Sequence, residues 1–203
     1  MPSFLPRAKP APYFPPAEGA YLDGRVVRFP EDLPAELNLL VVAFRDDLDP
    51  LADQWARLGA TLGQRYQGRL AALELPVVGH RLKSLGELAT LGIRAQVEGE
   101  AERARTVPIF VKKKAFRRAL GTHDSSDVYV FLVRRSGKIL WRTSGELAVG
   151  AVAELEETLA SVLGTPGPAP APAALSETEP PTAIPEERSG EDAAAADAPG
   201  APQ

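Results

Sequence analysis

Leu39-Leu-Val-Val-Ala-Phe44 is an uninterrupted apolar run, and Arg45-Asp-Asp-Leu-Asp-Pro50 follows it directly. A run without alternation is typical of a central strand that is covered by helices on both faces of a sheet. Pro50 suits the first position of a helix, and Asp49 is placed to cap the free amides before it. The sequence therefore predicts a buried strand leading into a helix over residues 50–66. The loop between them, residues 45–49, is where we expect functional groups.

The remaining elements are expected in the order βαβαβα, then a β-hairpin and a last helix. A strand over residues 68–75, closed by Pro76, should lie parallel to the first strand. Pro108 has no N–H to donate, so the strand over residues 106–111 should lie at an edge or be only partly paired. The turn at residues 135–137 should join strands 128–133 and 138–142. The other expected elements are an edge strand at 24–29, helices at 82–93 and 112–120, and a final helix that ends near Val162. Thr143 or Ser144 would cap the start of this final helix, and Glu146 would complete a capping box with Thr143.

The two ends of the 203-residue chain differ in composition from its middle. Residues 1–23 are rich in proline and predict an extended arm, either lying on the domain or free in solvent. Residues 165–203 contain seven acidic residues, one basic residue and few large aliphatic side chains, so we expect a disordered acidic Pro/Ala-rich tail. The expected folded domain is therefore residues 24–164.

The chain contains no cysteine. This inventory excludes disulfides, thiolate nucleophiles, cysteine-ligated zinc and iron–sulfur clusters. No apolar stretch approaches the length of a membrane-spanning helix, and the first ten residues contain no apolar core of a secretory signal. We therefore expect a cytoplasmic protein without a membrane span, and the residues indicate no cofactor.

The hairpin sequence Val128-Tyr-Val-Phe-Leu-Val-Arg-Arg-Ser-Gly-Lys-Ile-Leu-Trp-Arg142 resembles that of peroxiredoxin and TlpA-like members of the thioredoxin-like fold superfamily. Together with Leu39–Arg45 and Trp55, it is similar to the mitochondrial assembly factors of the F-type ATP synthase and their cysteine-free bacterial relatives. The similarity spans residues 20–163. It implies an α/β fold: a thioredoxin-like three-layer α/β/α sandwich with a mixed central sheet and a C-terminal β-hairpin plus helix.

Two departures from this resemblance bear on activity. Redox members of the fold carry their reactive cysteine in the loop after the central strand, where this chain has Arg45-Asp-Asp-Leu-Asp49. A proline normally precedes the strand that begins at Val128, where this chain has His123-Asp-Ser-Ser-Asp127. We therefore expect a protein-binding or assembly module without thiol redox chemistry, and no catalytic residues. An antioxidant or reductase of the AhpC/TSA-like type is the alternative that the resemblance itself suggests.

The residues around the central loop form the candidate site for a ligand or a protein partner. The guanidinium of Arg45 could hold a carboxylate or phosphate, or it could pair with Asp46 or Asp127. Acids at a helix start are favoured by the helix dipole alone, and their spacing matches no calcium loop, so no metal site is predicted. The candidate residues are Arg45, Asp46, Asp47, Asp49, Trp55, His123 and Asp127.

A second group of candidate residues is basic and suggests nucleic-acid binding as a further alternative. Such a group could face phosphates, or it could form a solvated surface. The group has no interleaved aromatic side chains and matches no known nucleic-acid-binding motif. Its members are Arg103, Arg105, Lys112, Lys113, Lys114, Arg117, Arg118, Arg134 and Arg135, with Lys138 and Arg142 on the same hairpin.

Overall fold

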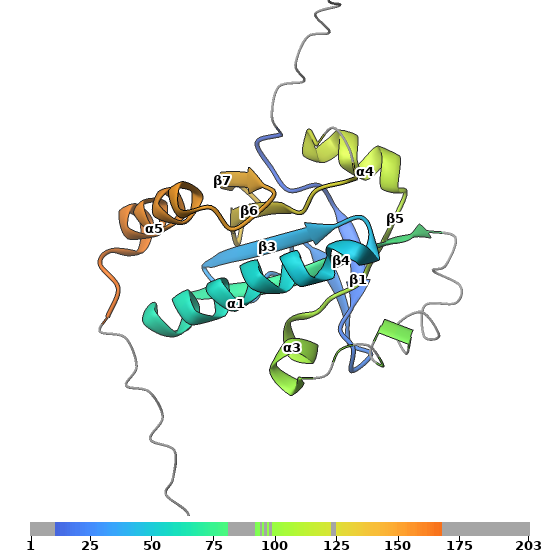
Figure 1. The fold of residues 1–203 in the computed structure, drawn as a ribbon, viewed down its shortest axis with the longest axis horizontal. Helices are drawn as coiled ribbons and strands as arrows, with labels where there is room; N and C mark the ends of the chain where they lie inside the picture. The colour runs from blue at the N-terminus through green and yellow to red at the C-terminus, as the bar shows by residue number, and fades with distance from the viewer. Residues whose placement is uncertain are drawn as a thin grey trace, which may run out of the picture. The chain divides into compact units, whose positions relative to one another are not determined.

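The computed structural model describes residues 11–80, 92, 93, 95, 97, 99–122 and 125–167. These residues form a seven-stranded mixed sheet in the order β2-β1-β5-β4-β3-β6-β7 (Figure 1). The strands are β1 (Ala17–Ala20), β2 (Val26–Phe29), β3 (Leu37–Ala43), β4 (Leu70–Gly79), β5 (Ile109–Val111), β6 (Tyr129–Arg134) and β7 (Ile139–Ser144). The helices among these residues include α1 (Asp49–Arg65), α3 (Glu100–Arg105), α4 (Lys113–Leu120) and α5 (Val149–Leu163), and a 3-10 turn covers Asp46–Leu48.

The predicted central strand, β3, lies in the interior of the sheet between β4 and β6, and all seven of its residues are buried. It pairs in parallel with β4 and antiparallel with β6, where Val42 lies opposite Tyr129. Strand β3 and the first strand of the hairpin, β6, are therefore neighbours in one sheet, as the sequence predicted. The loop after β3 and the segment before β6 consequently lie at the same edge.

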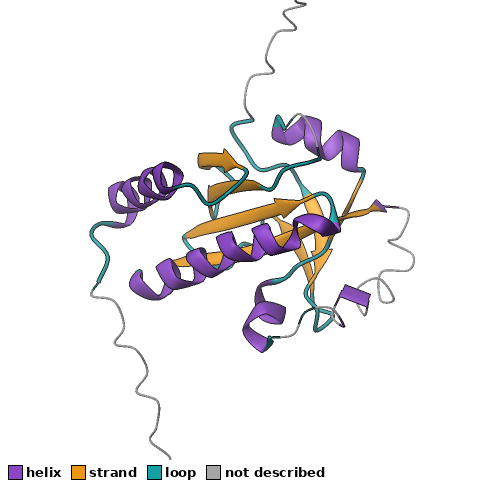
Figure 2. Cartoon of the chain, in the orientation of Figure 1, coloured by secondary structure: helices purple, strands orange, loops and turns teal. Residues whose placement is uncertain are grey.

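The side chains of β3 alternate between two separate cores, and helices contribute residues to each of them. Figure 2 shows the helices packed around the strands. Leu39 and Val41 belong to the core that α1 and α5 cover. Leu40 and Val42 belong to the opposite core, which includes Phe116 of α4. Because both faces of β3 are buried, its apolar run does not alternate. The predicted α/β class with helix layers on both sides of the sheet is confirmed.

Two glycines with positive φ end elements as the sequence predicted. Gly121 has φ +73 and terminates α4, and Gly137 has φ +84 in the turn between β6 and β7. A side chain at residue 137 would also collide with Pro30, whose Cγ lies 2.7 Å from the position of an added Cβ. The turn therefore requires glycine both for its backbone angle and for its close approach to the preceding segment.

The two predicted helix caps are wrong. Helix α1 begins at Asp49 itself, follows Leu48 and has no side-chain cap. Helix α5 begins at Val149, whereas Thr143 and Ser144 are paired in β7 with Val130 and Tyr129. The hairpin ladder uses these two residues, so the chain enters the last helix five residues later than the capping pattern indicated.

Several strand predictions also need correction. Strand β4 continues past Pro76 to Gly79, because Pro76 lies opposite Ala43 at the last pair of the ladder with β3. Strand β5 is interior, between β1 and β4, although it has a single paired position with β1, Gly19 opposite Ile109. The predicted partial pairing is thus found without the edge position.

The proline-rich N-terminal segment contributes to the fold. Ala17–Ala20 forms β1, and Phe14 is buried in the same core as Phe116, with ring centroids 5.8 Å apart. This part of the predicted arm is therefore part of the sheet and its core. The predicted helix at 82–93 lies outside the described residues except for its last two positions. The predicted tail lies outside them from residue 168.

Candidate functional site

Arg45 lies in the loop that follows β3 and pairs with Asp47. Its Nε donates to Asp47 Oδ1 at 2.8 Å, and its Nη2 donates to Asp47 Oδ2 at 2.6 Å. Both side chains are more than half exposed, so the pair contributes little to stability. The partner of Arg45 is therefore neither Asp46 nor Asp127, the two partners that the sequence suggested.

Asp49 is the first residue of helix α1 and follows directly on the same loop. Partial desolvation, followed by repulsion from Asp46 and Asp47, raises the pKa of the Asp49 carboxyl above its usual value. Within the described part of the chain, the Asp49 carboxyl has no hydrogen bond or ion pair, unlike that of Asp47. The loop therefore holds an excess of negative charge close to the start of the helix.

Trp55 is a core residue and is not available to a partner. It is fully buried between α1 and the sheet, and its Nε1 donates to the carbonyl oxygen of Gly145 at 3.0 Å. Its ring also contacts Trp141, with centroids 6.2 Å apart. Trp55 thus ties α1 to the end of β7. Asp127 precedes β6, at the end of the sheet where β3 leads into the Arg45 loop. His123 is outside the described residues.

The predicted basic surface does not form one patch. Arg105 is largely buried and pairs with Asp53 and Glu74, while Arg103 Nε donates to the carbonyl oxygen of Val97. Arg134 pairs with Leu37 at the far end of β3 from Phe44. Seven residues of strand separate these two ends by roughly 23 Å. Arg134 and Arg135 therefore cannot share a local surface with helix α4.

Helix α4 keeps a smaller basic surface at the carboxyl end of β3. Its Lys113 Nζ donates to the carbonyl oxygen of Phe44 at 2.9 Å, and the guanidinium of Arg117 lies 6.0 Å from the Phe44 ring centroid. Phe116 and Leu120 are buried beneath the helix. The remaining exposed cations of this segment are Lys112, Lys114 and Arg118.

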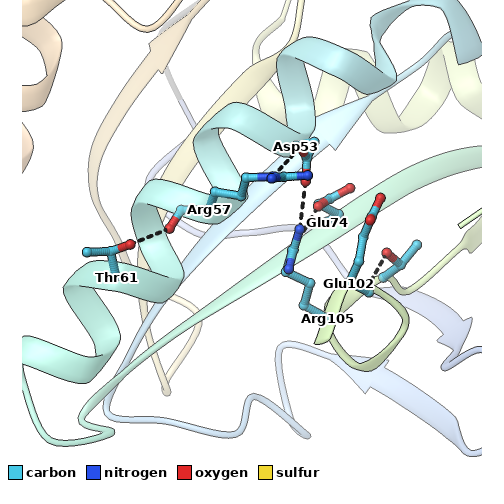
Figure 3. Close-up of polar contacts among 7 residues, drawn as sticks. Asp53, Arg57, Thr61, Glu74, Glu102 and Arg105 are labelled. Atoms are coloured by element: carbon cyan, nitrogen blue, oxygen red, sulfur yellow. Dashed lines mark hydrogen bonds and ion pairs between the residues drawn. The ribbon is translucent and has the colours of Figure 1, made fainter. Parts of the chain in front are cut away.

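A cavity of about 560 Å³ opens beside the loop, between α1, the end of β4 and α3. Its lining includes carboxylates from three elements, among them Asp53 of α1, Glu74 of β4 and Glu102 of α3. Figure 3 shows these three side chains around Arg105. Arg105 Nη2 donates to Asp53 Oδ1 at 2.6 Å and its Nε donates to Glu74 Oε1 at 3.1 Å. The guanidinium of Arg105 therefore forms ion pairs with two carboxylates.

Among the described carboxyl groups of the site, that of Glu74 has the largest pKa shift. Its side chain is nearly inaccessible, at 7% exposure. Desolvation raises the pKa of Glu74 from 4.5 to about 7 against the opposing effect of Arg105, and Asp53 and Glu102 add to the rise. The sequence analysis missed Asp53, Glu74 and Glu102. A usable signal was present, because Glu74 interrupts an otherwise apolar strand, Leu70–Leu75.

No group of three or more histidine, aspartate or glutamate side chains in the described ranges is arranged to hold a metal ion. Among the helices in those ranges, none has the length and apolar character that crossing a bilayer requires.

The sequence matches no known protein family and no curated protein. Similar solved structures include the exposed lipoprotein thioredoxin Etrx1 of Streptococcus pneumoniae, at 12% identity, covering 70% of this chain and 97% of that one, with a TM-score of 0.45. Copper-bound yeast Sco1 has 15% identity, coverages of 74% and 94%, and a TM-score of 0.46. AhpC of Mycobacterium tuberculosis has 16% identity, coverages of 77% and 98%, and a TM-score of 0.47. At these identities and TM-scores, the similarities assign no activity to this chain.

Proposed function

We propose that this chain is a non-catalytic thioredoxin-like protein that binds a protein partner at the edge formed by the loop after β3 and the start of α4. The observation that carries the proposal is the exchange of a nucleophile for an exposed ion pair. The loop that holds cysteine in redox members of the fold holds Arg45 paired with Asp47, and the chain has no cysteine elsewhere. Thiol peroxidase and disulfide reductase chemistry both require that sulfur.

The surface at this edge has the properties of a specific docking site. Acidic Asp46 and Asp47 lie in the loop, and basic Lys112 and Lys114 lie at the start of α4. The bond from Lys113 to the carbonyl oxygen of Phe44 joins the two segments. Adjacent patches of opposite sign select partners by charge complementarity and fix their orientation. The proposal therefore predicts a partner surface that presents cations to the loop and anions to the helix.

The test is affinity capture with the full-length protein from an extract of its own organism, quantified by mass spectrometry. The test variant is Asp46→Arg with Asp47→Arg, which reverses the loop charge. The matched control is Glu31→Arg with Glu157→Arg, since both of these acids are exposed and the charge change is the same. Proteins that the wild type and the control retain and the loop variant loses are the expected partners.

The proposal also requires that the protein has no peroxidase or disulfide reductase activity. The purified protein should not consume hydrogen peroxide or reduce a protein disulfide. Turnover of either substrate, or equal recovery of every captured protein by the wild type and the loop variant, would refute it. A role in assembly is implied only by the sequence resemblance to the assembly factors of the F-type ATP synthase.

Nucleic-acid binding has weaker support, because the basic residues are divided among three places. If α4 nevertheless bound nucleic acid, affinity would fall steeply with salt and would be lost in Lys112→Glu, Lys114→Glu, Arg118→Glu. These side chains are exposed, so the triple variant should keep its fold. Measuring binding to single- and double-stranded DNA and RNA at two salt concentrations separates this alternative from protein docking.

A further inference from the structure

The cavity beside α1 has the dimensions of a small-molecule site. Its volume of about 560 Å³ lies within the roughly 300–1,000 Å³ that such pockets occupy. Its walls combine apolar groups, including Pro76, Ile93 and Val97, with a few charged side chains. It is also open at the carboxyl ends of the parallel strands β3 and β4, where ligands of α/β proteins commonly bind.

The charged groups of the lining are mostly acidic. Glu74 at the base of the cavity, Asp53 and Glu102 on its sides, and Asp49 at its rim are all part of the lining. Arg105, which pairs with Glu74 and Asp53, is not part of the described lining. Arg105 compensates both of these carboxylates, and Arg57 also pairs with Asp53. The uncompensated acidic charge of the described lining therefore lies mainly on Glu102 and Asp49.

The basic side chains of the lining do not cancel this charge. Arg45 is already paired with Asp47, which lies outside the lining. Lys113 donates to the carbonyl oxygen of Phe44 and keeps its positive charge, but the carboxylates of the described lining outnumber it. The carboxylates of Glu102 and Asp49 have no hydrogen bond or ion pair to another described residue. A ligand that supplies positive charge and N–H donors would therefore meet groups that the protein has left uncompensated.

We propose that this cavity binds a small organic cation that carries amine or guanidinium groups, with Glu102 and Asp49 accepting its N–H donors and Glu74 supplying charge at the base. This is a site for a free small molecule, and it goes beyond the proposed docking of a protein at the neighbouring edge. The apolar walls suit the alkyl portion of such a ligand. A metal ion is a poorer match, because no three acidic or histidine side chains among the described residues are arranged to hold one.

Binding should depend on pH through Glu74. The groups that face Glu74 are Arg105 and Glu102 from α3 and Asp53 from α1. Burial keeps the pKa of Glu74 near 7 in the free protein, and a bound cation would favour its ionised form. Affinity should therefore rise between pH 5.5 and pH 8, and it should rise less in Glu74→Gln.

The experiment is calorimetric titration of the full chain with agmatine, which has one guanidinium and one primary ammonium group. Pentane-1,5-diol and glutarate serve as the neutral and anionic control probes. The test variant is Asp49→Asn with Glu102→Gln, and the matched control is Glu31→Gln with Glu157→Gln. Circular dichroism and melting temperature verify that each variant is folded. Physiological salt limits non-specific attraction of agmatine to the acidic residues beyond the cavity.

The expected result is saturable binding of agmatine alone, weakened at least about tenfold by the cavity variant, since two charge-assisted hydrogen bonds are lost. The surface control should bind agmatine as the wild type does. Equal affinity for agmatine and pentane-1,5-diol would overturn the inference. Unchanged agmatine binding by the cavity variant would overturn it as well, because the cation would then be bound elsewhere on the chain. Neither result bears on protein capture by the loop, so the two proposals can fail separately.

Discussion

Replacing Glu74 by glutamine should stabilise the protein at alkaline pH. The ionised carboxylate is buried in β4 and shares one guanidinium with Asp53, while Glu102 adds further negative charge nearby. Arg105 therefore compensates Glu74 only in part, and desolvation raises the pKa of Glu74 to about 7. Glutamine keeps the shape and can still accept the bond from Arg105, but it carries no charge to desolvate.

The sign and size of the effect follow from proton linkage. Below pH 4.5 the carboxyl is protonated in both the folded and the unfolded chain, so the substitution changes little. Between 4.5 and about 7 the unfolded chain releases its proton first, and wild-type stability falls as pH rises. At about 1.4 kcal/mol for each pH unit, the wild type loses about 3 kcal/mol that the variant retains.

The assay is urea unfolding of wild type, Glu74→Gln and the surface control Glu157→Gln at pH 5 and pH 8. The free energy of unfolding of Glu74→Gln should exceed that of the wild type by about 3 kcal/mol at pH 8 and by about 1 kcal/mol at pH 5. The control should show no such difference. A loss of stability in Glu74→Gln at pH 8 would mean that the ion pair with Arg105 outweighs desolvation, and the reasoning would be refuted.

Two further predictions use the same unfolding assay. Arg105→Met should lose about 3–5 kcal/mol at pH 8, because it leaves the buried carboxylate of Glu74 without its cation, and it should lose less at pH 5, where Glu74 is protonated. Arg57→Met removes an exposed partner of Asp53 and should lose under about 1 kcal/mol; equal losses would contradict the assignment. Gly59→Ala should cost about 1–3 kcal/mol, since its added Cβ would lie 2.7 Å from the Cβ of Ala72. Gly150→Ala, with no atom within 4 Å, should be neutral or stabilising, and a stabilised Gly59→Ala would show that α1 can move off the sheet.

The main features of the fold were predictable because they depend on long apolar patterns. The uninterrupted run in β3 requires a strand buried on both faces, and the glycine at residue 137 marks the hairpin turn. Helix entry was not predictable from capping residues alone. Thr143 and Ser144 had two possible uses, and pairing with β6 prevailed over capping. Strand β1 was missed because four residues with a central glycine carry almost no periodic signal.

The candidate site was only partly predictable, because it combines local and distant residues. The loop from Arg45 to Asp49 is continuous in sequence, so its position after a buried strand was enough to single it out. The cluster of Asp53, Glu74 and Arg105 comes from three elements separated by up to 52 residues. Trp55 was assigned to the wrong role, since sequence cannot distinguish a tryptophan that donates to a core carbonyl from one on a surface.

The stability of this fold and the chemistry of its edge reside in different residues. The ladders of β3 with β4 and β6 end at Ala43 and Val42, before the loop begins, and the buried hydrogen bond of Trp55 ends at Gly145. Residues 45–47 are exposed and take part in neither core. The charges of this loop can therefore be changed without disturbing the sheet. Glu74 is the exception, because it lies both in a central strand and in the cavity lining, so its charge affects folding and binding together.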